Sequence, residues 1–281
     1  MIIIQQAKED TNGCAKENVF LAFDEKEQYL GHGYVYPTVN RHQTYETPYL
    51  LYIEINVEEQ PQAEEIKKLL FEAIMERTKA LQIEKKELNC RIYAGFASNQ
   101  NMMDFYTRNG FEEDYSIFME ADLTQKTEDF SHQNLKVEEF SITEKEQYEE
   151  FKKLYDEMFV TPLDEGFAKA QKEDDSYKNF KFYVNEEIVG GFSLRVEDNC
   201  GWIENLYLYE VHRGKGLSKV MMNYIHNYFR EKGLSKSKLE VWELNRRAVK
   251  LYKIFGYQEV QKNLMFPGIT VYSGSNMSDR K

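Results

Sequence analysis

The chain has 281 residues, of which 42% are hydrophobic and 30% charged, a balance that supports packed domains and excludes a disordered composition. Its net charge of −12 makes nucleic acid and anionic membranes poor partners, because phosphate neutralisation needs a basic surface. No run of 18 apolar residues occurs and the start lacks a basic segment, so neither a membrane span nor an export signal is predicted.

The cysteines and the chain length indicate the kind of protein and the number of domains. Cys14, Cys90 and Cys200 are odd in number and widely separated, which favours reduced thiols in a cytoplasmic protein over a disulfide framework. No CxxC spacing occurs, so no metal site is expected. At this length, two domains are more usual than one.

The negative charge is concentrated in the first half of the chain. Residues 1–135 hold 13 lysines and arginines against 24 aspartates and glutamates, whereas residues 136–281 hold 23 against 24. A polyanionic ligand is therefore expected only in the second half.

The first half alternates strand and helix patterns. It opens with an aliphatic strand at 2–4, followed by a hairpin of 19–23 with 29–36 and a strand at 52–57. An amphipathic helix comes next, with its apolar stripe from Ile66 to Leu81. A strand at 91–96 and a short helix that stops at Gly110 complete this half.

The second half repeats this order. A hairpin of 180–184 with 188–196 and a strand at 202–209 precede a helix whose apolar stripe runs from Leu217 to Tyr228. A strand at 238–242 and a short helix that stops at Gly256 follow. We therefore predict an α/β (α+β) chain of two related domains, 1–123 and 136–281, joined by a linker at 124–135.

Two short segments carry the repeat most clearly. The sequence LYKIFGY at 251–257 matches FYTRNGF at 105–111, and an asparagine, Asn245 or Asn99, stands seven residues before each tyrosine. In both segments a glycine follows the last helical turn, where a left-handed backbone is needed.

Only the second copy carries a glycine-rich loop between a strand and a helix. Its residues are Arg213, Gly214, Lys215, Gly216, Leu217 and Ser218. Glycines let the backbone approach a ligand, and the N–H groups and dipole of the following helix favour a pyrophosphate. The loop matches neither the P-loop nor the dinucleotide fingerprint, and an ordinary strand-to-helix turn is the alternative interpretation.

With its flanking positions, this loop resembles the GNAT superfamily of N-acetyltransferases, and the resemblance runs from Trp202 to Tyr257. Ser218 departs from the Gly or Ala that is usual in the family. The resemblance implies, for each domain, a mixed, mostly antiparallel sheet flanked by helices and splayed between its fourth and fifth strands, where acetyl-CoA lies in the active copy. It also implies the cofactor contacts: the backbone of Leu206, Tyr207 and Leu208 for the pantetheine, the loop Arg213 to Ser218 for the pyrophosphate, and Asn245 and Tyr252 at the thioester.

The resemblance further implies direct attack of an amine on the thioester, which needs a base for the ammonium proton and an acid for the leaving thiolate. Tyr252 matches the acid of the family, and a core tyrosine is its alternative role. Glu204 is the expected base, acting through water, with a solvated strand residue as the alternative. Glu243 is the competing base.

The expected acceptor is a primary amine on a small molecule. In the region 141–179, Asp156, Asp164 and Glu165 would suit a cation, although a solvated acidic face is the more common role. A CoA or metabolite sensor without turnover, and transfer of another acyl or aminoacyl group, stay open as alternatives, as does a homodimer.

The first copy is expected not to bind CoA. Alignment of the two long helices places Gln62–Glu65 where Arg213–Gly216 stand, and residues 58–65 contain four carboxylates and no glycine. Such a loop repels a diphosphate. We therefore predict a degenerate N-terminal domain and a catalytic C-terminal one, and expect residues 136–281 alone to bind CoA.

Overall fold

The computed structural model describes all residues except 12, 45, 126–127, 143, 161, 164–165, 167–168, 170–173 and 275–281. The chain divides into two compact units, Met1–Tyr115 with Leu264–Lys281, and Ser116–Asn263. Among the described residues, no helix has the length and apolarity that a bilayer crossing requires. The three cysteines are free and buried.

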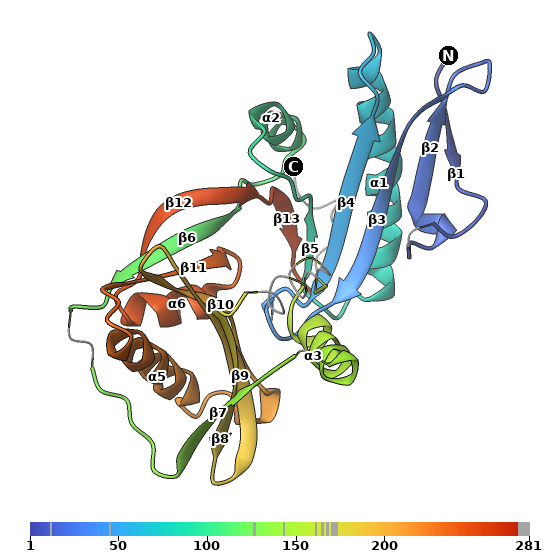
Figure 1. Cartoon of the computed structure of the whole chain (residues 1–281). Coiled ribbons are helices and arrows are strands. Elements are labelled where there is room, and N and C mark those ends of the chain that lie inside the picture. The colour runs from blue at the N-terminus through green and yellow to red at the C-terminus, as the bar shows by residue number, and fades with distance from the viewer. Residues whose placement is uncertain are drawn as a thin grey trace. The chain divides into compact units, whose positions relative to one another are not determined.

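The first unit is a six-stranded sheet flanked by helices (Figure 1). Its strands lie in the order β1 (Ile3–Gln6), β2 (Val19–Phe23), β3 (Tyr29–Val39), β4 (Tyr49–Val57), β5 (Cys90–Tyr93) and β13 (Gly268–Val271). Only β4 and β5 pair in parallel. Helix α1 (Ala63–Glu84) buries Ile66, Leu70 and Ile74 in the core with the sheet, and α2 (Gln100–Arg108) adds Phe105 and Tyr106. The apolar stripe predicted from Ile66 to Leu81 is thus the buried face of α1.

The second unit is a seven-stranded sheet flanked by helices. Its strands lie in the order β12 (Gln258–Met265), β6 (Tyr115–Asp122), β11 (Lys236–Trp242), β10 (Cys200–Leu208), β9 (Glu187–Glu197), β8 (Tyr177–Val184) and β7 (Leu135–Phe140). Its helices in the described part of the chain are α3 (Lys145–Met158), α5 (Leu217–Glu231) and α6 (Arg246–Ile254). Two mixed sheets flanked by helices confirm the predicted fold class.

The compact units differ from the predicted segments 1–123 and 136–281 by an exchange of strands. Strand β6 follows the last helix of the first half, yet it lies between β12 and β11, where Ser116–Asp122 pairs antiparallel with Lys236–Trp242. Strand β13, near the chain end, pairs instead with β5 of the first sheet. Alternation of apolar and polar residues specifies which face of a strand is buried, but not which strand lies beside it.

The repeated segments form equivalent helix ends. Gly110 and Gly256 follow α2 and α6 with φ angles of 85° and 84°, in the left-handed region that favours glycine. Asn99 and Asn245 are the N-caps of these helices, and each side-chain oxygen accepts a hydrogen bond from the backbone three residues on. Helix capping therefore explains why the asparagine occurs in both copies.

Candidate active site

The second sheet opens at its middle. Strand β10 pairs in parallel with β11 only from Gly201 to Ile203, although β10 continues to Leu208. On its other side β10 pairs with β9, and the register shifts between Ile203 and Asn205, so that Glu204 is a β-bulge. The segment 204–208 thus extends beyond the β11 ladder, which is the splay that the sequence implied.

The glycine-rich loop begins α5 next to this split. Gly214 and Gly216 have φ angles of 75° and 78°, and a Cβ atom built on either would meet no atom within 4 Å. The loop is therefore open at both glycines. Its left-handed backbone favours glycine at these two positions, because side chains are strained there. Gly216 is the N-cap of α5, whose first N–H groups and dipole favour an anion. These features fit the pyrophosphate of CoA.

Arg213 ties this loop to the end of β10. Its Nε donates to the carbonyl oxygen of Leu208 at 3.0 Å, and burial lowers the pKa of the guanidinium. Lys215 is exposed on the same loop, and Leu217 is buried beneath it. The predicted loop residues thus lie together beside Leu206, Tyr207 and Leu208, which form the last part of β10.

Tyr252 lies on α6 and is buried. Its ring packs against that of Tyr257 with the centroids 5.8 Å apart, and burial raises the pKa of its hydroxyl to about 12. The Tyr257 hydroxyl lies 2.6 Å from Ser237 Oγ and 3.2 Å from His226 Nε2. Tyr252 thus has a fixed ring and a protonated hydroxyl at neutral pH.

Comparison with known proteins identifies this region. Residues 144–257 match the model of the Acetyltransferase (GNAT) family. This part of the chain is therefore similar to the GNAT family. The match includes the bulged strand, the glycine-rich loop and Tyr252, and the two mixed sheets fit a tandem arrangement of GNAT-like domains.

Relatives of the chain are distant. It is 27% identical over 84 residues to the uncharacterized N-acetyltransferase YobR of Bacillus subtilis (strain 168), which is 30% of this chain and 34% of that protein. The match thus spans about a third of the relative's length. A conserved protein of unknown function from Enterococcus faecalis V583, a probable N-acyltransferase, has a TM-score of 0.51 at 12% identity, over 95% of this chain and 72% of that one. It shares the fold.

A tandem GNAT protein from the clavulanic acid biosynthesis pathway is a further similar structure. Its TM-score is 0.43 at 11% identity, over 90% of this chain and 82% of that one.

In the region that matches this family, Glu204 is held by an ion pair. Its Oε1 lies 2.6 Å from Nε of Arg195, which also pairs with Glu197. The Arg195 guanidinium lies over the rings of Tyr177 and Trp202, at 5.5 and 5.2 Å from their centroids. Burial chiefly, and the charge of Glu204 in addition, raise the pKa of Tyr177. Glu204 is therefore a fixed, half-buried carboxylate at the bulge, and not a freely solvated one.

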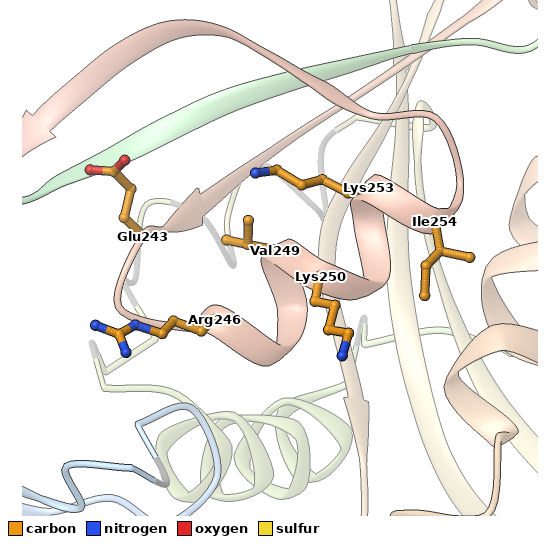
Figure 2. A pocket seen from close by; sticks show the side chains of 6 residues that line it. All are labelled: Glu243, Arg246, Val249, Lys250, Lys253 and Ile254. Atoms are coloured by element: carbon orange, nitrogen blue, oxygen red, sulfur yellow. The ribbon is translucent and has the colours of Figure 1, made fainter.

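Glu243, the competing base, lies in a different setting. Figure 2 shows it on the segment between β11 and α6, where it lines a shallow pocket of about 440 Å³. The other residues of the pocket are Arg246, Val249, Lys250, Lys253 and Ile254. Glu204 is not among them. The two candidate bases thus lie in different local environments.

The predicted acceptor-side carboxylates are partly described. Asp156 on α3 pairs with Lys152 at 2.7 Å and accepts a hydrogen bond from the backbone of Leu163. A structural role therefore accounts for Asp156. Asp164 and Glu165 lie outside the described residues.

Sequence reasoning missed a buried polar residue beside Glu204. Asn205 is 5% exposed, and neither atom of its side-chain amide has a hydrogen-bond partner among the residues that the structure describes. An unpaired buried amide costs about 1–3 kcal/mol. The signal available in the sequence was an asparagine next to Glu204, in a strand whose other residues from Trp202 to Leu208 are apolar or aromatic.

Proposed function

We propose that this protein is an acetyl-CoA-dependent N-acetyltransferase that acts on a primary amine of a small molecule. One observation carries the proposal: β10 leaves the β11 ladder at its bulge, directly before the loop whose glycines begin α5. An unpaired strand edge suits a pantetheine amide chain, and the helix start suits the pyrophosphate. When bound, acetyl-CoA supplies an activated acetyl thioester.

The cofactor would be held by backbone more than by side chains. Leu206, Tyr207 and Leu208 offer the N–H and C=O groups of the open edge. The loop from Arg213 to Ser218 offers the N–H groups of its left-handed turns, with the charge of Lys215 close by. Asn245 caps α6, so its contribution is to place the helix that carries Tyr252.

Glu204 is the proposed base. A primary amine is mostly protonated at neutral pH, so a carboxylate must take its proton, directly or through one water, before the nitrogen can attack. Arg195 keeps the Glu204 carboxylate in one place on the sheet face. A positioned base of this kind contributes on the order of 10²-fold to the rate.

Tyr252 is the proposed proton donor to the departing sulfur. Its raised pKa of about 12 keeps the hydroxyl protonated throughout the physiological range. The same shift makes it a weaker acid than a free phenol. Its main effect would then be a hydrogen bond that strengthens as negative charge develops on the sulfur.

The first unit is proposed not to bind the cofactor. At the equivalent helix start, Gln62 is the N-cap of α1, and Glu64 and Glu65 occupy the first turn. No residue from 58 to 65 has a positive φ angle. Carboxylates at this position repel a diphosphate, and the backbone lacks a left-handed turn to cradle one.

A screen for CoA release tests the proposal. The full-length protein is incubated with acetyl-CoA and, in turn, alkylamines, polyamines, aminoglycosides, amino acids, amino amides and peptides, and free thiol is measured. Release that depends on an amine, with the acetylated amine detected by mass spectrometry, is the expected result. Binding of acetyl-CoA without acetylation of any amine would favour a sensor over an enzyme.

A further inference from the structure

Three buried polar side chains form a row across the second sheet. Asn179 of β8 pairs with Ser193 of β9, and Ser193 pairs in turn with Asn205 of β10. Residues opposite one another on antiparallel strands project from the same face, so the three side chains lie on one face. None is more than 5% exposed.

The two ends of this row differ in their hydrogen bonding. Ser193 Oγ donates to Asn179 Oδ1 at 2.5 Å. Asn205 Nδ2 and Oδ1 have no such partner in the described part of the chain. Buried polar groups in native proteins are hydrogen-bonded as a rule. A polar group of a bound ligand would supply the hydrogen bonds that the Asn205 amide lacks.

Asn205 shares its face of the sheet with the proposed base. Arg195 follows Ser193 by two residues on β9 and therefore projects from the same side as Ser193 and Asn205. Arg195 contacts the carboxylate of Glu204, so that carboxylate also reaches this face. An amine held at Glu204 would thus present its neighbouring atoms to Asn205.

We propose that Asn205 binds the acyl acceptor and selects amines with an amide or a hydroxyl group close to the reacting nitrogen. The inference rests on the N-acetyltransferase function proposed above. The Asn205 amide offers N–H donors and a carbonyl acceptor, and both kinds are unpaired. An amide or a hydroxyl group of the substrate can hydrogen-bond both to the N–H donors and to the carbonyl oxygen of Asn205. A carboxylate can bond only to the N–H donors, and an ammonium only to the carbonyl oxygen.

A stability measurement separates this role from a structural one. Asn205→Leu replaces the amide by an apolar side chain of similar size and removes an unpaired polar group, so the free protein should melt about 3 °C or more higher. Asn179→Leu is the matched control, since Asn179 is equally buried but hydrogen-bonded, and it should melt lower. A lower melting temperature for Asn205→Leu would mean that the amide is already satisfied in the free protein, and would overturn the proposal.

Kinetics with four amines of one carbon skeleton test the selectivity. In the wild-type protein, kcat/KM for alaninamide and 2-amino-1-propanol should exceed that for alanine and isopropylamine by roughly tenfold. Asn205→Leu should remove this difference and leave the KM for acetyl-CoA unchanged.

Two outcomes overturn the inference in distinguishable ways. Equal kcat/KM for the four amines, or a preference that persists in Asn205→Leu, contradicts it while leaving the acetyltransferase function in place. No CoA release with any of the four also contradicts it, and the wider amine screen described above then tells whether the proposed function fails as well.

Discussion

Arg195 Nε donates to Glu204 Oε1 at 2.6 Å, at the bulge where β10 separates from β11. Both side chains are less than one fifth exposed, and the guanidinium is packed on the rings of Tyr177 and Trp202. The pair therefore has a defined geometry that an exposed ion pair would lack. A carboxylate held in this way can order a water toward an incoming amine.

Glu204→Gln keeps the shape of the side chain and removes the base. We expect kcat/KM for an amine acceptor to fall about 10²-fold near neutral pH, where the amine is protonated. Part of the activity should return at alkaline pH, where free amine exists in solution. The pH–rate profile measures this, with Glu243→Gln as the control that should resemble wild type. If Glu243→Gln shows the loss of kcat/KM instead, the base is Glu243. If neither variant shows it, bulk water accepts the proton of the amine.

Tyr252→Phe removes one hydroxyl and keeps the ring against Tyr257. Folding and acetyl-CoA affinity should survive, while kcat should fall on the order of 10²-fold, as after loss of a positioned donor. Tyr106→Phe is the matched control, because Tyr106 is the buried equivalent in the first unit. Wild-type turnover in Tyr252→Phe would mean that the thiolate departs without help from this residue.

His226 should make stability depend on pH. Burial, with a smaller contribution from the charge of Arg230, lowers its pKa to about 4, against about 6.5 in the unfolded chain. Between these values the unfolded chain binds a proton that the folded protein does not. The stability from His226 is therefore complete above about pH 6.5 and is lost as the pH falls toward 4.

Denaturant unfolding of wild type and His226→Gln measures this effect. The free energy of unfolding of wild type should drop by about 2 kcal/mol more than that of the variant between pH 7 and pH 5. Glutamine does not titrate in this range, so parallel pH dependences of the two proteins would contradict a buried neutral His226.

The repeat, the element order and the cofactor loop could be predicted because each depends on local sequence. Glycine at 110, 214, 216 and 256 marks left-handed turns, and the stripe from Leu217 to Tyr228 has helical spacing. The exchange of β6 and β13 could not be predicted, because strand order depends on pairing between distant segments. The ion pair of Glu204, and the lack of a hydrogen-bond partner for the Asn205 amide among the described residues, likewise depend on side chains from neighbouring strands.

The strand exchange changes what an isolated second half should do. Residues 136–281 were expected to bind CoA alone, but this fragment lacks β6, which supplies seven residue pairs to β11 and buries Ile117, Met119 and Ala121. We now expect that fragment to misfold, and residues 115–281 to fold and bind acetyl-CoA. Circular dichroism and calorimetry compare the two fragments. Native-like folding and binding by 136–281 would show that β6 is dispensable.

The most direct test of the account is calorimetric titration of the full-length protein with acetyl-CoA. One site per chain is predicted, and Gly216→Glu should abolish it by placing a negatively charged side chain in the open cradle at the start of α5. Gly233→Glu is the matched control, since Gly233 follows the other end of the same helix with the same φ of 78° and equally open space, and it should bind as wild type. Two sites per chain, or unchanged binding by Gly216→Glu, would contradict a single cofactor site in the second unit.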